Sequence, residues 1–190
     1  IVLPQMGEVK SLRQNSGPDF TPGHPCDILI LIRRAAPRGG EAMNLKEQTV
    51  TSRTIYEGRI VKLTLDQARL PDGKLADREV VYHPGGVAVL ALEEDHTVFL
   101  VEQYRYPIHQ LLLEVPAGKL DPGEDPRVAA ARELGEETGL EATEWTDLGY
   151  TLASPGFCDE KLHLYLARGL TRRAQHPDED EFLDVVTMPF

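Results

Sequence analysis

The chain has 190 residues, enough for one ordinary domain with a hydrophobic core and a small appendage. Its formal charge of −11 argues against nucleic acid as a partner, but not against anionic substrates, because a bound metal ion can invert the local field. No stretch reaches the roughly 18 consecutive apolar residues that cross a bilayer. Cys26 and Cys158 lie far apart and suggest no disulfide framework, so we expect a cytoplasmic protein with no membrane partner.

Residues 1–43 differ in character from the rest of the chain. They mix proline, glycine, serine and arginine around one short apolar run, 28–32, and show no sustained period. Because Met43 stands just ahead of the first coherent pattern, we interpret residues 1–43 as an irregular N-terminal extension that is upstream or non-native sequence. A signal peptide is the competing interpretation, although prolines and acidic residues precede the apolar run.

The pattern becomes β-rich from residue 49 onward. It predicts strands over 54–56 and 59–68, a turn at 70–73 and a returning strand over 77–83. We therefore predict a small N-terminal antiparallel β-domain over residues 44–84. Its expected roles are dimerisation and substrate contacts. A Pro-Gly-Gly sequence at 84–86 separates this unit from the remainder of the chain.

Residues 85–190 form the predicted catalytic domain. The apolar runs and turn signals predict five strands, over 87–92, 97–103, 111–115, 145–153 and 161–167. A helix is predicted between the third and fourth of them. Asp125 suits the N-cap, Pro126 suits the first helical position and Gly139 supplies the C-terminal stop.

The predicted helix carries the strongest functional pattern of the chain. Gly118 is followed after five residues by Glu124, and after seven more by Arg132-Glu133-Leu134-Gly135-Glu136-Glu137-Thr138-Gly139-Leu140. Glu133, Glu136 and Glu137 share one helical face, where like charges repel. A divalent cation turns that repulsion into a ligand set, because Mg²⁺ prefers hard oxygen donors. A solvated acidic face is the alternative, but it leaves the placement of the glycines and the arginine unexplained.

This spacing resembles the signature of the Nudix hydrolases, G-x5-E-x7-R-E-U-x-E-E-x-G-U, in which U is a bulky aliphatic residue, and every fixed position is filled. The resemblance implies an α/β protein, the Nudix α/β/α sandwich, that cleaves a diphosphate with Mg²⁺, for which Mn²⁺ or Zn²⁺ can substitute. It implies Glu133, Glu137 and the backbone carbonyl of Ala117 as metal ligands. Glu136 is implied as a catalytic carboxylate that either binds the metal or supports its ligands. For Glu124 and Arg132 we favour a structural ion pair over direct catalysis.

Four segments outside the signature resemble the ADP-ribose pyrophosphatase group, and the likeness extends over about residues 44–187. They are REVVYHPG at 78–85, VEQYR at 101–105, EVPAG at 114–118 and SPGFCDE at 154–160. In this group a proline about sixteen residues beyond the signature marks the substrate, and Pro155 lies sixteen residues after Gly139. The implied reaction is the cleavage of ADP-ribose into AMP and ribose 5-phosphate.

Several residues are candidates for binding that substrate. Arg78 and Arg105 suit phosphate or the ribose-adenine portion, because guanidinium groups match phosphate oxygens, and a surface arginine is the alternative for each. Gly156 lies beside Pro155 in the substrate loop. Glu160 suits a ribose hydroxyl, with a simple loop carboxylate as the alternative. Tyr56 is a candidate to stack on adenine across a dimer interface, with a buried strand tyrosine as the alternative.

The general base is expected in a loop after the last core strands, where this group carries a glutamate that activates or positions the water. The acidic segment 176–182 matches that loop, and we favour Glu181 with Glu179 as the alternate. A solvated acidic loop is the other interpretation.

Relatives in this group pair their N-terminal β-domains, so a homodimer is expected. They also continue into a C-terminal helix, which is expected to be missing here because the chain stops at Phe190. Two other functions remain open. One is hydrolysis of another nucleoside diphosphate derivative, such as a nucleotide sugar, a dinucleotide or an oxidised nucleotide. The other is a sensor that binds ADP-ribose without turnover, although such modules usually lose the signature glutamates that this chain keeps.

Overall fold

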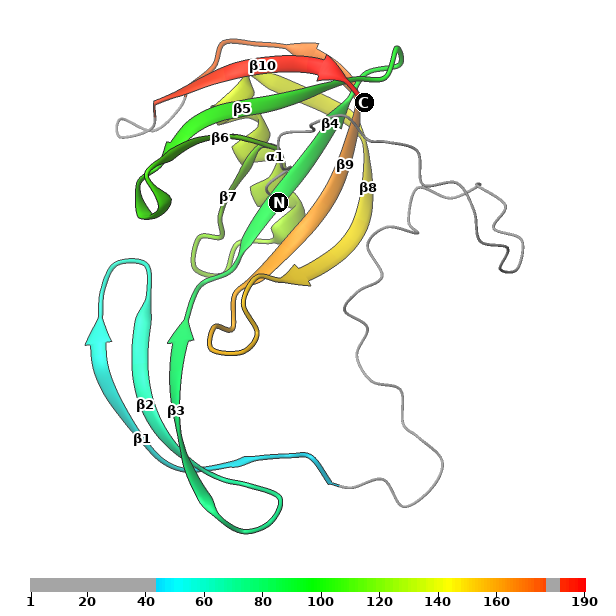
Figure 1. Cartoon of the computed structure of the whole chain (residues 1–190). Helices are drawn as coiled ribbons and strands as arrows, with labels where there is room; N and C mark the ends of the chain where they lie inside the picture. The colour runs from blue at the N-terminus through cyan, green and yellow to red at the C-terminus, as the bar shows by residue number, and fades with distance from the viewer. Residues whose placement is uncertain (1–43, 177–181) are drawn as a thin grey trace, which may run out of the picture.

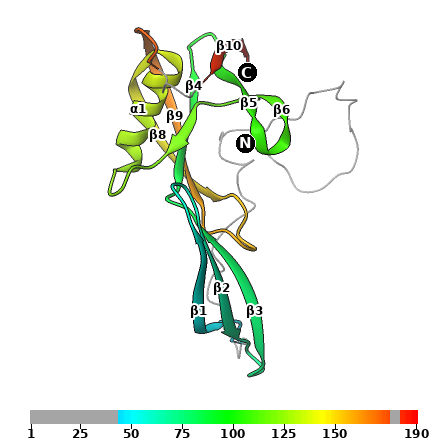
Figure 2. The same ribbon diagram turned by 90° about the vertical axis from the view of Figure 1, so that its left-hand side faces the viewer.

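The computed structural model describes residues 44–176 and 182–190, which form two β-sheets and one α-helix. The smaller sheet is antiparallel and has the order β1 (Gln48–Glu57), β2 (Lys62–Arg69) and β3 (Leu75–Tyr82). It extends away from the rest of the described chain (Figures 1 and 2), and β3 leads directly into the larger sheet. β1 begins six residues before the predicted strand at 54, because the exposed sequence Gln48–Arg53 also pairs with β2, with a register shift between Thr49 and Thr51. Residues 1–43, interpreted from the sequence as an irregular N-terminal extension, lie outside the described residues.

The larger sheet has seven strands and mixed direction. Its strands are β4 (Gly86–Leu92), β5 (Thr97–Arg105), β6 (Gln110–Glu114), β7 (Ala117–Lys119), β8 (Leu140–Leu152), β9 (Lys161–Arg172) and β10 (Leu183–Pro189). The main path is β10-β5-β4-β9-β8, with β6 paired to β5 and β7 paired to β4. β4 and β9 are parallel, and the other pairs are antiparallel. A short 3₁₀ helix, η1 (Tyr106–Ile108), joins β5 to β6.

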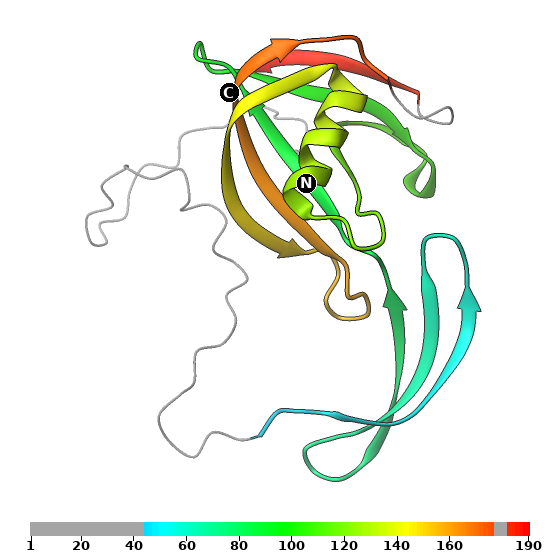
Figure 3. The same ribbon diagram turned by 180° about the vertical axis from the view of Figure 1, so that it is seen from behind.

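The helix α1 (Pro126–Thr138) covers one face of this sheet (Figure 3). Its boundaries match the prediction, because the Asp125 carboxylate accepts from the backbone N–H groups of Arg127 and Val128. The buried residues of α1 include Ala129, Ala130 and Leu134, which pack with Val87, Val89, Ala91, Phe99, Leu140, Tyr165 and Ala167. The small alanines bring the helix close to the sheet. No helix within residues 44–176 and 182–190 is long and apolar enough to cross a membrane.

The opposite face of the sheet carries a second apolar cluster, formed by Leu92, Val98 and Leu100 with Leu90, Leu113, Val115 and Leu166 at its margin. Residues of β4 alternate between the two clusters, as the period of a strand requires. The mixed sheet, its helix and the separate antiparallel sheet confirm the predicted α/β fold class.

Three strands of the larger sheet differ from the sequence-based expectation. The short strand β7, which pairs with β4, is absent from the predicted strands. β10 follows the acidic segment and is also absent from them, yet it pairs with β5 from Leu183 to Pro189. β8 begins at Leu140, immediately after the helix, rather than at residue 145. In each case pairing with a neighbouring strand satisfies the backbone hydrogen bonds of a segment whose own sequence does not mark it as a strand.

The C-terminus of α1 is closed by the chain that follows β9. Gly139 adopts φ +67 and donates its N–H to the carbonyl of Gly135. The side chain of Gln175 donates to the Glu137 carbonyl at 2.6 Å, and the His176 N–H donates to the Glu136 carbonyl at 3.1 Å. The last turn of the helix, which carries two of the three signature glutamates, is therefore held at its carbonyl end as well.

Substituting Gly139 by alanine is expected to destabilise the fold by about 2–4 kcal/mol, because the backbone is left-handed and the new Cβ meets crowded backbone. That Cβ would lie 2.6 Å from the Arg173 carbonyl oxygen and 3.1 Å from the Gln175 nitrogen. Gly73 is the matched control, since it has φ +86 but open space around it, and Gly73→Ala is expected to cost only about 1 kcal/mol. Urea unfolding measures both values. Equal losses would contradict the crowding argument.

Candidate active site

The signature glutamates lie where α1 faces the short strand β7. Glu133 and Glu137 are buried, and the Glu137 Oε2 accepts from the Ala117 N–H at 3.0 Å. The Glu133 carboxylate lies directly against Gly118, so any side chain at that position would overlap it. Glu136 is more accessible than these two glutamates, and its side chain is 35% exposed. The first glycine of the signature is thus required by the close approach of a buried carboxylate to the backbone.

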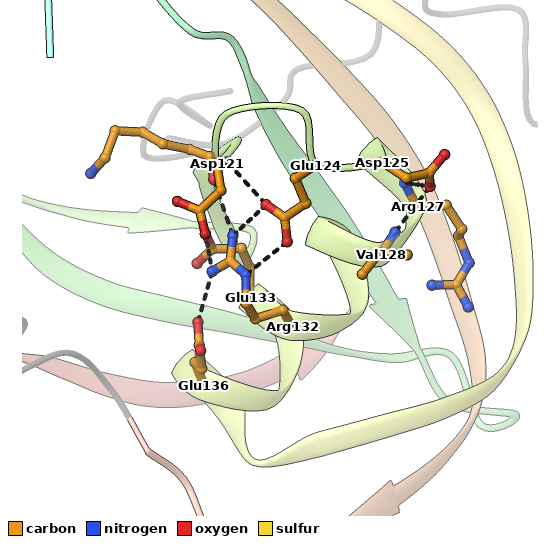
Figure 4. Close-up of polar contacts among 9 residues, drawn as sticks. Asp121, Glu124, Asp125, Arg127, Val128, Arg132, Glu133 and Glu136 are labelled. Atoms are coloured by element: carbon orange, nitrogen blue, oxygen red, sulfur yellow. Dashed lines mark hydrogen bonds and ion pairs between the residues drawn. The ribbon is translucent and has the colours of Figure 1, made fainter.

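The Arg132 guanidinium joins the acidic residues of the site (Figure 4). Its Nη1 donates to Glu133 at 2.8 Å and to Glu136 at 2.9 Å. Its Nε and Nη2 donate to the two carboxylate oxygens of Glu124, each at 3.0 Å. Nη2 also donates to the Lys119 carbonyl at 3.2 Å. The predicted ion pair between Glu124 and Arg132 is therefore present, and it fixes the loop after β7 to the helix.

Charge in this cluster is balanced by hydrogen bonds. The hydrogen bond from Arg132, together with the N–H of Asp121, lowers the pKa of Glu124 below its ordinary value. The same partnership with Glu124, aided by the charge of Glu133, raises the pKa of Arg132 despite its partial burial. Both groups consequently stay ionised across the physiological range.

A cavity of about 720 Å³ opens beside the same loop, between the β1–β2 turn and the end of β5. Its lining residues are Arg59, Ile60, Pro84, Gln103, Tyr104, Arg105, Lys119, Leu120, Asp121, Pro122 and Phe182. Arg105, a predicted substrate residue, lines this cavity and binds the buried Glu114 through its Nε at 3.0 Å and its Nη2 at 2.6 Å. Gln103 donates to the same carboxylate at 3.2 Å. Glu114 therefore sets the position of the arginine at the cavity wall.

A second cavity, of about 470 Å³, also borders the Arg132 cluster. Its wall includes Arg132, Glu136, Glu141, Arg173 and His176. Glu136 thus faces open space, whereas the carboxylates of Glu133 and Glu137 are turned toward β7.

The remaining predicted substrate residues do not line the larger cavity. Arg78 is paired with Glu47, at 3.0 Å from its Nε and 2.7 Å from its Nη2. Tyr56 is 58% exposed on β1, which rules out the alternative of a buried strand tyrosine. Pro155 and Gly156 lie in an exposed turn. The roles predicted for these residues stay predictions.

Two other predictions concern the region around this site. The Glu160 carboxylate lies 3.7 Å from His83 Nδ1 and is not among the residues that line the larger cavity. Glu179 and Glu181 lie outside the described residues. The chain on either side of them is placed: His176 binds the end of α1, and Phe182 lines the larger cavity.

Comparison with known proteins decides the family. A model of the NUDIX domain matches residues 82–190, more than half of the chain. This protein belongs to the Nudix family. A model of the nucleoside diphosphate sugar hydrolase N-terminal domain matches residues 47–81, which carry the three-stranded sheet.

The Nudix chain is also similar to individual proteins and to a solved structure. It is 48% identical to the "Methanol dehydrogenase activator" of Bacillus methanolicus over 75% of its own length and 78% of the relative. It is 41% identical to the "ADP-ribose pyrophosphatase" of Bacillus subtilis over the same shares of the two chains. It is 43% identical to the "ADP-ribose pyrophosphatase" of Mycobacterium tuberculosis over 70% of its length and 67% of that relative. A crystal structure of an ADP compounds hydrolase matches with a TM-score of 0.67 at 26% identity, covering 76% of this chain and 78% of that one.

Nudix hydrolases generally work with a divalent metal ion, and the signature glutamates of this chain are the oxygen ligands available for it. In the described part of the chain, no three His, Cys, Asp or Glu side chains are gathered so that they could hold a metal ion. The chemistry of the donors nevertheless fits Mg²⁺, because three carboxylates project from adjacent positions of one helix, and two of them converge on a single guanidinium nitrogen. Arg132 supplies positive charge to Glu133 and Glu136 from the same side.

Gln103 and Glu114 lie within the segments at 101–105 and 114–118 that resemble the ADP-ribose pyrophosphatase group, but the sequence assigns no role to them or to Lys119. A signal for the first two was available, because Gln103 and Arg105 alternate on β5, and Glu114 is paired with Val101 two residues before Gln103. No comparable signal exists for Lys119. Its place in the cavity wall depends on how the loop after β7 is held by Arg132.

Substituting Glu124 by glutamine is expected to lower the free energy of unfolding by about 1–2 kcal/mol near neutral pH, because the charge-assisted pair with Arg132 is lost. The pKa of Glu124 is lowered in the folded state, so its contribution is fully present above the ordinary value of 4.5 and disappears as the pH falls through the lowered value. Urea unfolding at about pH 7 and about pH 3 should therefore show a difference that shrinks in acid.

The control for this prediction is Glu141→Gln, which breaks an exposed pair with Arg173. Such a pair is worth about 0–1 kcal/mol, so a small and nearly pH-independent effect is expected. A Glu124→Gln variant that matched this control would contradict the proposed importance of the cluster.

Proposed function

We propose that this Nudix hydrolase cleaves the diphosphate of ADP-ribose with Mg²⁺ and releases AMP and ribose 5-phosphate. The observation that carries the proposal is the placement of two buried signature glutamates on one side of the β7 segment and a cationic cavity beside the loop that follows it. The names of the relatives that are 41% and 43% identical support the choice of substrate.

Each part of the site has a proposed task. Glu133, Glu136, Glu137 and the carbonyl of Ala117 are the residues that would hold Mg²⁺. When bound, Mg²⁺ neutralises diphosphate charge and lowers the pKa of a nearby water. Gly118 leaves room for the Glu133 carboxylate, and Arg132 keeps the loop after β7 in place.

The larger cavity is the proposed binding site for the diphosphate. Arg105 and Lys119 line it and offer cationic donors that suit phosphate oxygens. Arg105 keeps its orientation through the buried Glu114, so it meets the substrate in a fixed pose. Ile60 and Leu120 add apolar area to the same wall, which suits a nucleoside.

We keep Glu181, with Glu179 as the alternate, as the proposed general base. The position of the flanking chain supports this choice. His176 is bound to the carbonyl of Glu136, and Phe182 lines the larger cavity, so the segment between them starts at the acidic helix and ends at the proposed substrate site.

We also propose a homodimer formed through the N-terminal sheet. The exposed apolar side chains of that sheet include Val50, Ile55, Tyr56 and Leu75, and β1 is exposed along its whole length. Within such a dimer, Tyr56 and Arg78 of one protomer are proposed to complete the substrate site of its partner, with Pro155, Gly156 and Glu160 on the facing loop. A mass of two chains in light scattering tests this assembly. The cytoplasm is the proposed compartment, since Cys26 and Cys158 suggest no disulfide framework.

Activation of a dehydrogenase is a second candidate function, supported by the name of the relative that is 48% identical. Hydrolysis of a different nucleoside diphosphate derivative is the nearest enzymatic alternative.

A substrate panel tests the proposed reaction. Purified protein with Mg²⁺ should release AMP from ADP-ribose faster than it turns over NADH, GDP-mannose or 8-oxo-dGTP, and a chelator should abolish the release. No preference for ADP-ribose would defeat the substrate proposal. Tight binding of ADP-ribose without any turnover would favour the sensor.

Two glutamate variants separate metal binding from water activation. Glu137→Gln should lower kcat about 100-fold and weaken Mg²⁺ binding in calorimetry, because it removes an oxygen charge that the ion needs. Glu181→Gln should lower kcat by about 100-fold or more and leave Mg²⁺ binding unchanged, as expected for a general base. A Glu181→Gln variant with wild-type kcat would remove that residue from the mechanism, and Glu179→Gln would be tested next.

A further inference from the structure

The loop between β8 and β9, residues 153–160, is bonded to the junction of the two sheets. Its own turn is closed by the Ser154 carbonyl, which accepts from the N–H groups of Phe157 and Cys158. The Val81 N–H near the end of β3 then donates to the Phe157 carbonyl at 2.7 Å, and the Asp159 N–H donates to the Val81 carbonyl at 3.1 Å. These bonds form a single parallel bridge between Val81 and Cys158, so the loop pairs with β3 like a short extra strand.

The side chain of Asp159 prolongs this pairing by one more bond. Its Oδ1 accepts from the His83 N–H at 2.8 Å. His83 lies two residues beyond Val81, so its N–H faces the same edge of the extended chain. The next residue is Pro84, which has no N–H to donate. The Asp159 carboxylate therefore binds the last backbone donor before Pro84, at the point where the chain leaves the small sheet.

The neighbouring residue, Glu160, also lies near His83. Its Oε1 is 3.7 Å from His83 Nδ1, and its side chain is 30% exposed. That nitrogen accepts from the Gly85 N–H at 3.1 Å, which places the proton of the neutral ring on Nε2. A neutral His83 consequently does not donate to Glu160, and the place of Glu160 depends on the backbone of the loop.

We infer that Asp159 is a positioning residue, whose carboxylate fastens the loop 153–160 to the junction between the two sheets and so sets where Glu160 lies. The inference rests on the proposed function in one respect, namely that Glu160 contacts the substrate. Asp159 acts through its single acceptor oxygen on the His83 N–H, so its negative charge is dispensable. This property separates a positioning role from a direct role in binding metal or substrate, for which the charge is needed.

Two substitutions at Asp159 test the inference. Asp159→Ala removes the acceptor and is expected to raise KM for ADP-ribose about threefold to tenfold, with kcat within about twofold of wild type. Asp159→Asn keeps an acceptor oxygen at the same position and is expected to restore KM to within about twofold of wild type. The matched control is Asp95→Ala, because Asp95 likewise accepts one backbone N–H, from Thr97 at 2.9 Å, in the distant β4–β5 turn.

Hydrogen exchange measured by mass spectrometry supplies a readout that needs no substrate. The peptide covering residues 153–160 should exchange about threefold to tenfold faster in Asp159→Ala than in wild type, Asp159→Asn or Asp95→Ala. An Asn variant as impaired as the Ala variant would overturn the inference, as would an Ala variant with wild-type KM. If the wild-type protein does not cleave ADP-ribose, the proposed function fails, and the exchange rate of this peptide alone then supports or overturns the positioning role.

Discussion

The multiple hydrogen bonds of Arg132 are the interaction on which the rest of the site depends. One guanidinium binds Glu124 in the loop after β7, Glu133 and Glu136 on α1, and the carbonyl of Lys119. Three carboxylates within a few ångströms would repel one another, and the arginine offsets that repulsion. The same contacts set where the loop meets the larger cavity, so charge balance and cavity shape have one physical cause.

The helix that carries these residues is held at both ends and along its buried side. Asp125 closes its N-terminus, and the chain after β9 closes its C-terminus through Gln175 and His176. Small side chains, Ala129 and Ala130, let it lie close to β4. The position of the glutamates is thereby determined by the packing of the helix as well as by its sequence. A rigid support of this kind suits catalysis, because small displacements of a ligand set weaken both binding and rate.

The junction between the two sheets connects the proposed substrate loop with the N-terminal sheet. Val81 and His83 belong to the end of β3 and the turn after it, yet their backbone bonds go to residues 157–159 between β8 and β9. A change in the orientation of the small sheet would therefore shift the loop that carries Glu160, because these hydrogen bonds join the two. The cavity beside Arg105 includes Arg59 and Ile60 from the small sheet, so its shape depends on both parts of the chain.

The sequence alone determined the family resemblance, the boundaries of α1, the ion pair of Glu124 with Arg132 and the strands with clear hydrophobic runs. These features depend on local spacing, on caps and on short-range charge, all of which are visible in one segment. Only the tertiary structure decided that β10 and the first residues of β8 form strands, because the partners of their backbone hydrogen bonds lie on β5 and β9. It also decided that Glu114 orients Arg105, that Glu137 meets the Ala117 N–H, and that Asp159 binds His83. Those contacts join residues from different strands, loops and the helix, and no local pattern of one segment specifies which distant backbone group will lie beside it.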